Sequence, residues 1–81
     1  MQNILSKWTY QNVTSFLGEK GFDFYDEFEH SQSWVRGGHK GEPDRFVEVK
    51  FTQKFYTPKA LQRMIRQSGI DESEWIKWMT P

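Results

Sequence analysis

Hydrophobic and polar positions alternate along the chain with two periods, one typical of helices and one typical of strands. Val13, Phe16 and Leu17 recur at the i, i+3 and i+4 spacing, which predicts the apolar face of a helix over residues 10–20. Thr9 directly precedes this segment and is a favourable helix N-cap. The first element is therefore expected to be an amphipathic helix.

The next segment, residues 22–30, follows the two-residue period of a strand. One face is expected to hold Phe22, Phe24 and Phe28, and the other Asp23, Tyr25, Glu27 and Glu29. Asp26 falls on the apolar side and interrupts the alternation. This interruption indicates a bend, a strand end or a functional site.

Two further strands are predicted downstream. The polar stretch SQS is expected to form a turn or the start of a strand, and SWVR continues it. Residues 37–44 contain three glycines and one proline, a composition typical of a mobile loop. Residues 45–51 show the clearest alternation, with Val47 and Val49 on one side and Glu48 on the other. These residues predict the best-defined strand of the chain.

The C-terminal third contains start and stop signals typical of two helices. Thr57 and Pro58 are typical of a helix start, and Gly69 is typical of a helix end. The apolar stripe between them consists of Ala60, Leu61, Met64 and Ile65. Asp71 is expected to cap a short last helix that carries Trp75, Trp78 and Met79 on its contact face.

This order predicts a single α+β domain over residues 1–81. Three consecutive strands joined by short loops favour an antiparallel meander. Two helices are expected to cover one face of this sheet, in a two-layer arrangement completed by the short C-terminal helix.

Composition narrows the classes of function. There is no cysteine and there are only two histidines, so neither a metal site nor a cofactor is expected. No apolar run approaches the length of about 20 residues that spans a membrane, and MQNILSKW lacks a signal-peptide pattern. We expect a cytoplasmic protein without a membrane partner. Aromatic residues make up 17% of the chain, which suits a small core or, as an alternative, stacking on nucleic-acid bases.

Charge is segregated although the net charge is zero. Residues 19–29 carry five carboxylates and one lysine, and residues 45–66 carry six basic residues and one glutamate. The spacing of Lys59, Arg63 and Arg66 places them on one helix face, which Lys50 and Lys54 extend as a candidate nucleic-acid-binding surface. The alternative is a solvated helix face. The candidate protein-binding residues are Asp26, Glu27, Glu29, Trp75 and Trp78.

The order of elements resembles the plan of the double-stranded-RNA-binding domain, and more closely the HicA-type toxins of bacterial toxin–antitoxin pairs. ALQRMIRQSGI followed by DESEW is similar to the C-terminal end of that family, and Lys20-Gly21-Phe22 is similar to its first helix end. The resemblance extends over about residues 9–76. It implies an α-β-β-β-α fold, messenger-RNA cleavage, RNA as the substrate and an antitoxin protein as a partner.

The resemblance also points to a position for catalysis. The family's Gly-Ser-His motif falls on Glu29-His30-Ser31, followed by the expected aromatic residue, Trp34. Ser31 therefore stands at the family's histidine position, and His30 precedes it by one residue, which on a strand would mean the opposite face. Metal-free RNA cleavage needs an acid or base that titrates near neutral pH.

His30 is the first candidate for this role and His39, in the glycine-rich loop, is the second. Solvated histidines without a role are the alternative at both positions. The second functional hypothesis is a non-catalytic interaction protein of the same fold, which binds a protein or a nucleic acid.

Overall fold

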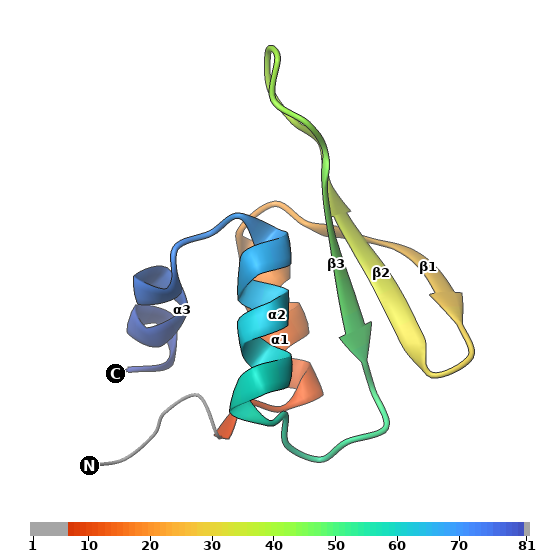
Figure 1. Cartoon of the computed structure of the whole chain (residues 1–81), viewed down its shortest axis with the longest axis vertical. Coiled ribbons are helices and arrows are strands. Elements are labelled where there is room, and N and C mark those ends of the chain that lie inside the picture. Colours follow the sequence, from red (N-terminus) through yellow and green to blue (C-terminus); the bar gives the residue numbers. More distant parts are fainter. Residues whose placement is uncertain (1–6, 81) are drawn as a thin grey trace.

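A computed structural model describes residues 7–80, which form a three-stranded antiparallel sheet with helices on one side (Figure 1). The predicted α+β class, the antiparallel meander and the order of elements are confirmed. The strand order is β1-β2-β3, so β2 is central. The elements are α1 (Tyr10–Glu19), β1 (Asp23–Phe28), β2 (Ser31–Arg36), β3 (Arg45–Lys50), α2 (Pro58–Ser68) and α3 (Glu72–Met79).

Local chemistry sets the helix ends. At the start of α1, the Thr9 hydroxyl accepts a hydrogen bond from the Asn12 backbone, and the Asn12 side chain accepts one from the Thr9 N–H. This reciprocal capping satisfies two backbone donors that the helix itself leaves free. The helix ends at Glu19, one residue earlier than predicted. At the end of α2, Gly69 adopts a left-handed conformation with φ of 72°.

The helices pack mainly on β3. Val47 and Val49 are fully buried between this strand and the helices, whereas every residue of β1 is exposed. The outer edge of β3 is also occupied, because the Glu48 N–H donates to the Gln67 side chain of α2 at 2.9 Å. The helix layer therefore covers one side of the sheet and leaves β1 as a free edge.

A bulge in β1 corrects the predicted distribution of its side chains. The pairing with β2 shifts between Phe24 and Asp26, so Tyr25 is an extra residue without a partner. An extra residue reverses the alternation of the residues after it. Phe24 lies on the helix side of the sheet, whereas Asp26 and Phe28 lie on the helix-free side, and the prediction that Phe24 and Phe28 share a face is wrong.

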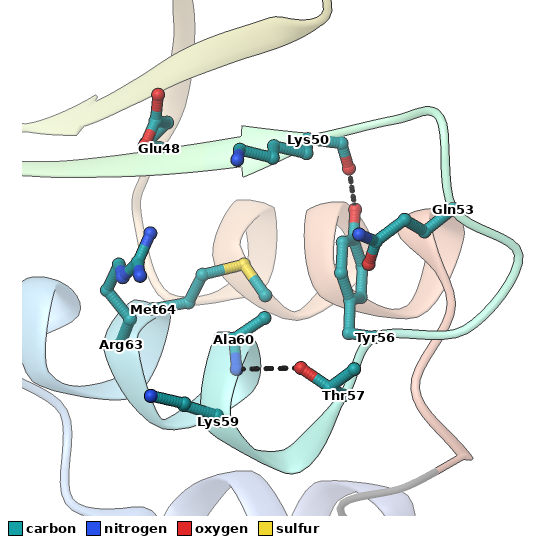
Figure 2. A pocket seen from close by; sticks show the side chains of 9 residues that line it. All are labelled: Glu48, Lys50, Gln53, Tyr56, Thr57, Lys59, Ala60, Arg63 and Met64. Atoms are coloured by element: carbon teal, nitrogen blue, oxygen red, sulfur yellow. Dashed lines mark hydrogen bonds between the residues drawn. The ribbon is translucent and has the colours of Figure 1, made fainter.

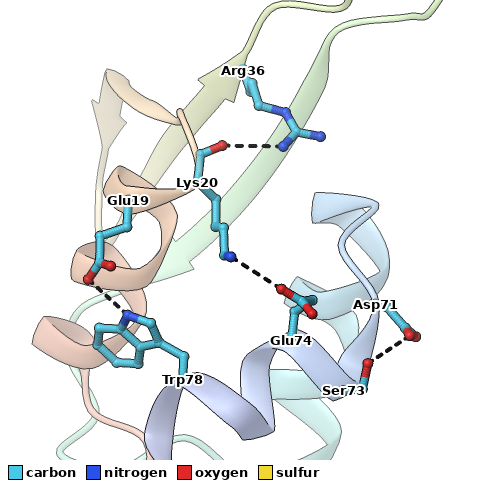
Figure 3. Close-up of polar contacts among 7 residues, drawn as sticks. All are labelled: Glu19, Lys20, Arg36, Asp71, Ser73, Glu74 and Trp78. Atoms are coloured by element: carbon cyan, nitrogen blue, oxygen red, sulfur yellow. Dashed lines mark hydrogen bonds and ion pairs between the residues drawn. The ribbon is translucent and has the colours of Figure 1, made fainter.

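Aromatic rings join α1 and α3 in the core. Trp8 lies 5.3 Å from Trp75 and 5.6 Å from Trp78 between ring centroids, and Phe16 lies 4.3 Å from Trp75. Trp75 is fully buried, so its proposed role in binding a partner is corrected: its side chain is a core residue. The partly buried Trp78 also packs on this cluster and donates its indole N–H to Glu19 at 2.8 Å (Figure 3).

Polar contacts tie the same elements together at the surface (Figure 3). The Lys20 ammonium lies 3.3 Å from the Glu74 carboxylate, which links the end of α1 to α3. Arg36 of β2 donates to the Lys20 carbonyl at 3.2 Å. A cation at the C-terminal end of a helix is favourable because it complements the helix dipole. Within residues 7–80, no helix combines the length and the apolar character needed to cross a membrane.

Replacing Trp75 tests the aromatic core. We expect Trp75→Ala to lower the free energy of unfolding by about 3–5 kcal/mol, the usual cost of removing a large buried aromatic ring. Trp75→Phe should cost clearly less, because the indole N–H makes no hydrogen bond within residues 7–80. Urea unfolding followed by far-UV circular dichroism measures both variants. Equal stability of Trp75→Ala and the wild type would contradict the core role.

Candidate nucleic-acid interface

His30 lies in the tight turn between β1 and β2. Phe28 pairs with Ser31, so the turn consists of Glu29 and His30. SQS is the start of β2, which was one of the two predicted alternatives. Glu29 has a φ of 56°, in the left-handed region that non-glycine residues rarely adopt. The conformation costs about 1 kcal/mol and is repeatedly found at functional turns.

The turn places His30 and Ser31 beside the same depression on the helix-free face of the sheet. Because His30 belongs to a turn and not to a strand, strand alternation does not apply to it, and both residues line the depression. The His30 carbonyl accepts a hydrogen bond from Phe51 N–H at 3.3 Å, which anchors the turn to the chain after β3. The depression, of about 450 Å³, is lined by Asp26, Phe28, Glu29, His30, Ser31, Ser33, Glu48, Lys50, Thr52 and Gln53.

A second hollow, of about 160 Å³, lies between β3 and the first turns of α2 (Figure 2). Tyr56, Ala60 and Met64 supply its apolar surface. Three cations, Lys50, Lys59 and Arg63, line it together with Glu48, and Gln53 and Thr57 complete the lining. Three positive charges against one carboxylate make this cleft favourable for an anion.

The two hollows adjoin each other along β3. Glu48, Lys50 and Gln53 line both of them, so His30 at one end is connected to Arg63 at the other. Topology produces this meeting: in an antiparallel meander, the β1–β2 turn and the end of β3 lie at the same end of the sheet. Since α2 starts just after β3, its first basic residues reach the same place. We call the hollow between β3 and α2 the basic groove; the depression beside His30 also carries the carboxylates of Asp26 and Glu29.

The buried side chain of Tyr56 lines the basic groove and is fixed by a hydrogen bond. This side chain is almost fully buried, and its hydroxyl donates to the Lys50 carbonyl (Figure 2). Burial, and to a lesser extent the neighbouring Tyr10, raise the pKa of Tyr56 to about 12. The Thr57 hydroxyl accepts a hydrogen bond from Ala60 N–H at 3.1 Å and caps α2 beside it.

Two predicted basic residues lie outside the groove. Lys54 sits in the connection after β3, with its ammonium 5.7 Å from the centre of the Phe55 ring. Arg66 lies further along α2 and lines a shallow depression with Glu72 of α3. The prediction of one basic surface that includes all five residues is therefore corrected to a groove with Lys50, Lys59 and Arg63.

His39 lies at the opposite end of the sheet from His30. It borders a hollow of about 740 Å³ together with Lys20, Arg36 and Arg45. The six residues of β2 separate the two histidines, a span of about 20 Å at the usual rise of a strand. They cannot act on one bond or bind one ion. Within residues 7–80, no cluster of three or more His, Cys, Asp or Glu side chains has a geometry suitable for a metal ion.

The predicted acidic patch is divided between the two faces of the sheet. Asp26 and Glu29 line the depression beside His30. Glu27 lies on the helix side, where its carboxylate accepts a hydrogen bond from the Gln32 amide at 3.0 Å. Asp26 and Glu27 are consecutive strand residues and so point to opposite faces, while the turn places Glu29 beside the depression.

Six residues that line the basic groove were not among the predicted site residues: Glu48, Gln53, Tyr56, Thr57, Ala60 and Met64. Glu48 had a signal, since it alternates with buried valines and so had to face away from the core. Tyr56 and Gln53 lie in an irregular connection without periodicity, and only the path of that connection brings them to α2. Neither the models of known protein families nor the curated proteins provide a match for this chain.

High pH tests the buried Tyr56. Its pKa is higher in the folded chain than in the unfolded chain, where it is about 10. The folded form therefore retains a proton that the unfolded form loses, and stability decreases as the pH rises from about 10 to 12. The expected loss is about 2–3 kcal/mol relative to pH 9. Urea unfolding at several pH values should show this loss in the wild type and not in Tyr56→Phe, which controls for other titrating groups.

Proposed function

We propose that this protein binds RNA through the basic groove, as a HicA-like member of the double-stranded-RNA-binding plan. The proposal is supported by the convergence of Lys50, Lys59 and Arg63 on a cleft that adjoins the depression beside His30. No ion pair joins any of these three cations to a carboxylate within residues 7–80. Their charges are therefore available to phosphates.

The chemistry of the groove suits a nucleotide chain. Lysine offers a compact positive charge and arginine a planar donor group, and both are common ligands of phosphate oxygens. The apolar surface of Tyr56, Ala60 and Met64 between them can receive a sugar or a base edge. Double-stranded-RNA-binding domains contact RNA by shape and by phosphate and 2′-hydroxyl contacts, which the resemblance of the fold favours here.

Cleavage is the activity that the HicA-like resemblance implies, and His30 is the group proposed to perform it. His30 would take the proton from a 2′-hydroxyl, whose oxygen then attacks the adjacent phosphorus to form a 2′,3′-cyclic phosphate. The P–O5′ bond breaks, the 5′-oxygen takes a proton from water and leaves as an alcohol, and the protonated His30 returns its proton to the solvent. Lys50, which lines the same depression, would stabilise the negative charge that develops on the phosphate. Ser31 does not replace the histidine, because an unactivated hydroxyl does not take up a proton near neutral pH.

Removing two cations from the groove tests RNA binding. We expect Lys59→Ala/Arg63→Ala to weaken binding of a fluorescein-labelled unstructured RNA by about 10- to 100-fold, because two charged contacts are lost. The slope of log K against log salt should fall by about 1.4, the value for two phosphate contacts to a single strand. Fluorescence anisotropy in a potassium chloride series measures both quantities.

The matched control is Lys54→Ala/Arg66→Ala, which removes the same charge outside the basic groove. This variant should retain most of the affinity and the slope. Equal losses in the two double variants would mean that only overall charge matters. An affinity of the wild type that does not depend on salt would overturn the proposal.

The catalytic proposal is tested with labelled RNA in the presence of EDTA. We expect the wild type to cleave and His30→Ala to be slower by about 10²- to 10⁴-fold, the range for loss of a general acid or base. His39→Ala, at the opposite end of the sheet, should cleave at the wild-type rate. Growth arrest on expression should likewise be relieved by His30→Ala and not by His39→Ala. Binding without any cleavage would retain the RNA proposal and reject the nuclease.

A further inference from the structure

Strand β1 is the least covered element of the fold. All six of its residues are exposed, including three aromatic side chains: Phe24 at 52%, Tyr25 at 65% and Phe28 at 75%. Figure 1 shows β1 at the margin of the sheet farthest from α2. Phe24 lies on the helix side, but the helices do not extend far enough to bury it. Exposed aromatic residues grouped on one strand are typical of a contact surface.

The outer edge of β1 has free hydrogen-bonding capacity. β2 occupies one side of β1, and no strand of residues 7–80 lies on the other. The Glu27 N–H donates to the Asp26 carboxylate at 2.8 Å and not to the backbone of β2. This donor therefore belongs to the free edge, where an added strand could accept it. The edge of β3 differs, because Gln67 of α2 already occupies it.

Charge indicates the kind of strand that fits. Asp23, Asp26, Glu27 and Glu29 lie on β1 and its turn, and none is ion-paired within residues 7–80. This negative field is unfavourable for RNA along the outer edge of β1. It also opposes pairing of β1 with β1 of a second copy, because the carboxylates of both strands would face each other. A positively charged polypeptide is the favoured occupant.

We propose that an extended segment of a partner protein, rich in lysine or arginine, adds to the sheet as a fourth strand beside β1. A carbonyl of this segment accepts the Glu27 N–H, which releases the Asp26 carboxylate to pair with a basic side chain. Phe24 on one face and Phe28 on the other pack against its apolar residues. Strand addition uses backbone hydrogen bonds for affinity and side-chain contacts for specificity. This binding does not require that the chain also bind RNA.

The experiment uses a synthetic peptide of alternating lysine and valine as the probe. We expect it to shift the backbone amide signals of residues 23–28 in NMR spectra and to slow hydrogen exchange at the Glu27 N–H by about tenfold or more. A glutamate–valine peptide should have no effect. The lysine–valine peptide with alternate N-methylated residues keeps its charge and side chains but cannot form the edge hydrogen bonds, so it should bind at least about tenfold more weakly.

A pair of variants tests the edge from the side of the protein. Glu27→Pro and Glu27→Ala remove the same charge, but only the proline also removes the outward N–H; proline is tolerated on edge strands at such positions. We expect Glu27→Ala to bind the peptide moderately less well and Glu27→Pro to lose binding. The amide signals of β2 and β3 report whether Glu27→Pro remains folded. If this variant unfolds, the comparison of the N-methylated and unmodified peptides on the wild type still tests the edge hydrogen bonds.

Several results would overturn the proposal. Equal binding of the N-methylated and unmodified peptides would reduce the interaction to charge alone. If the peptide shifted only amide signals of residues outside β1, the binding site would not be this edge. Dimerisation of the free protein in sedimentation experiments, lost in Glu27→Pro, would identify a second copy as the occupant. Shifts of residues 23–28 caused by RNA and not by the peptide would identify a nucleic acid.

Discussion

The packing of α1 and α2 against Val47 and Val49 of β3 is the interaction on which the rest of the structure depends. It buries the apolar face of the most regular strand and brings α2 alongside β3, close enough for Gln67 to bind the edge of the strand. A chain of 81 residues has too little helix to extend this cover across the whole sheet. The position of the core therefore decides which surfaces remain open to other molecules.

Two open surfaces of opposite charge result. The basic groove forms where α2 begins beside the end of β3, and the acidic edge forms at β1, on the other side of the sheet. The net charge of zero does not reveal this separation. Most charges are not neutralised by ion pairs, since within residues 7–80 the only ion pair is Lys20–Glu74. The proposed phosphate contacts lie between β3 and α2, and the proposed strand-addition site is the outer edge of β1. Asp26 and Glu29 border both that edge and the depression beside His30.

Irregular backbone controls what each surface displays. The bulge at Tyr25 moves Asp26 and Phe28 to the helix-free face, and the two-residue turn brings His30 beside Ser31 above the same depression. Glu29 holds this turn in a left-handed conformation. A regular strand through residue 30 would have given His30 and Ser31 opposite directions. The proposed HicA-like role of His30 is therefore compatible with the one-residue displacement of the histidine.

The sequence by itself determined the order of the elements, the caps of α1 and α2, and the buried faces of both helices, because periodicity and capping act over a few neighbouring residues. The alternation of Val47, Glu48 and Val49 likewise predicted the face of β3. Only the tertiary structure decided that Trp75 is a core residue, that Arg66 and Lys54 lie apart from the groove, and that Tyr25 forms a bulge. These outcomes depend on contacts between segments distant in the chain, where packing and backbone pairing outweigh local preference. The proximity of Lys50 to Lys59 and Arg63 also depends on the tertiary structure, because the side chains packed between a strand and a helix set the distance between them.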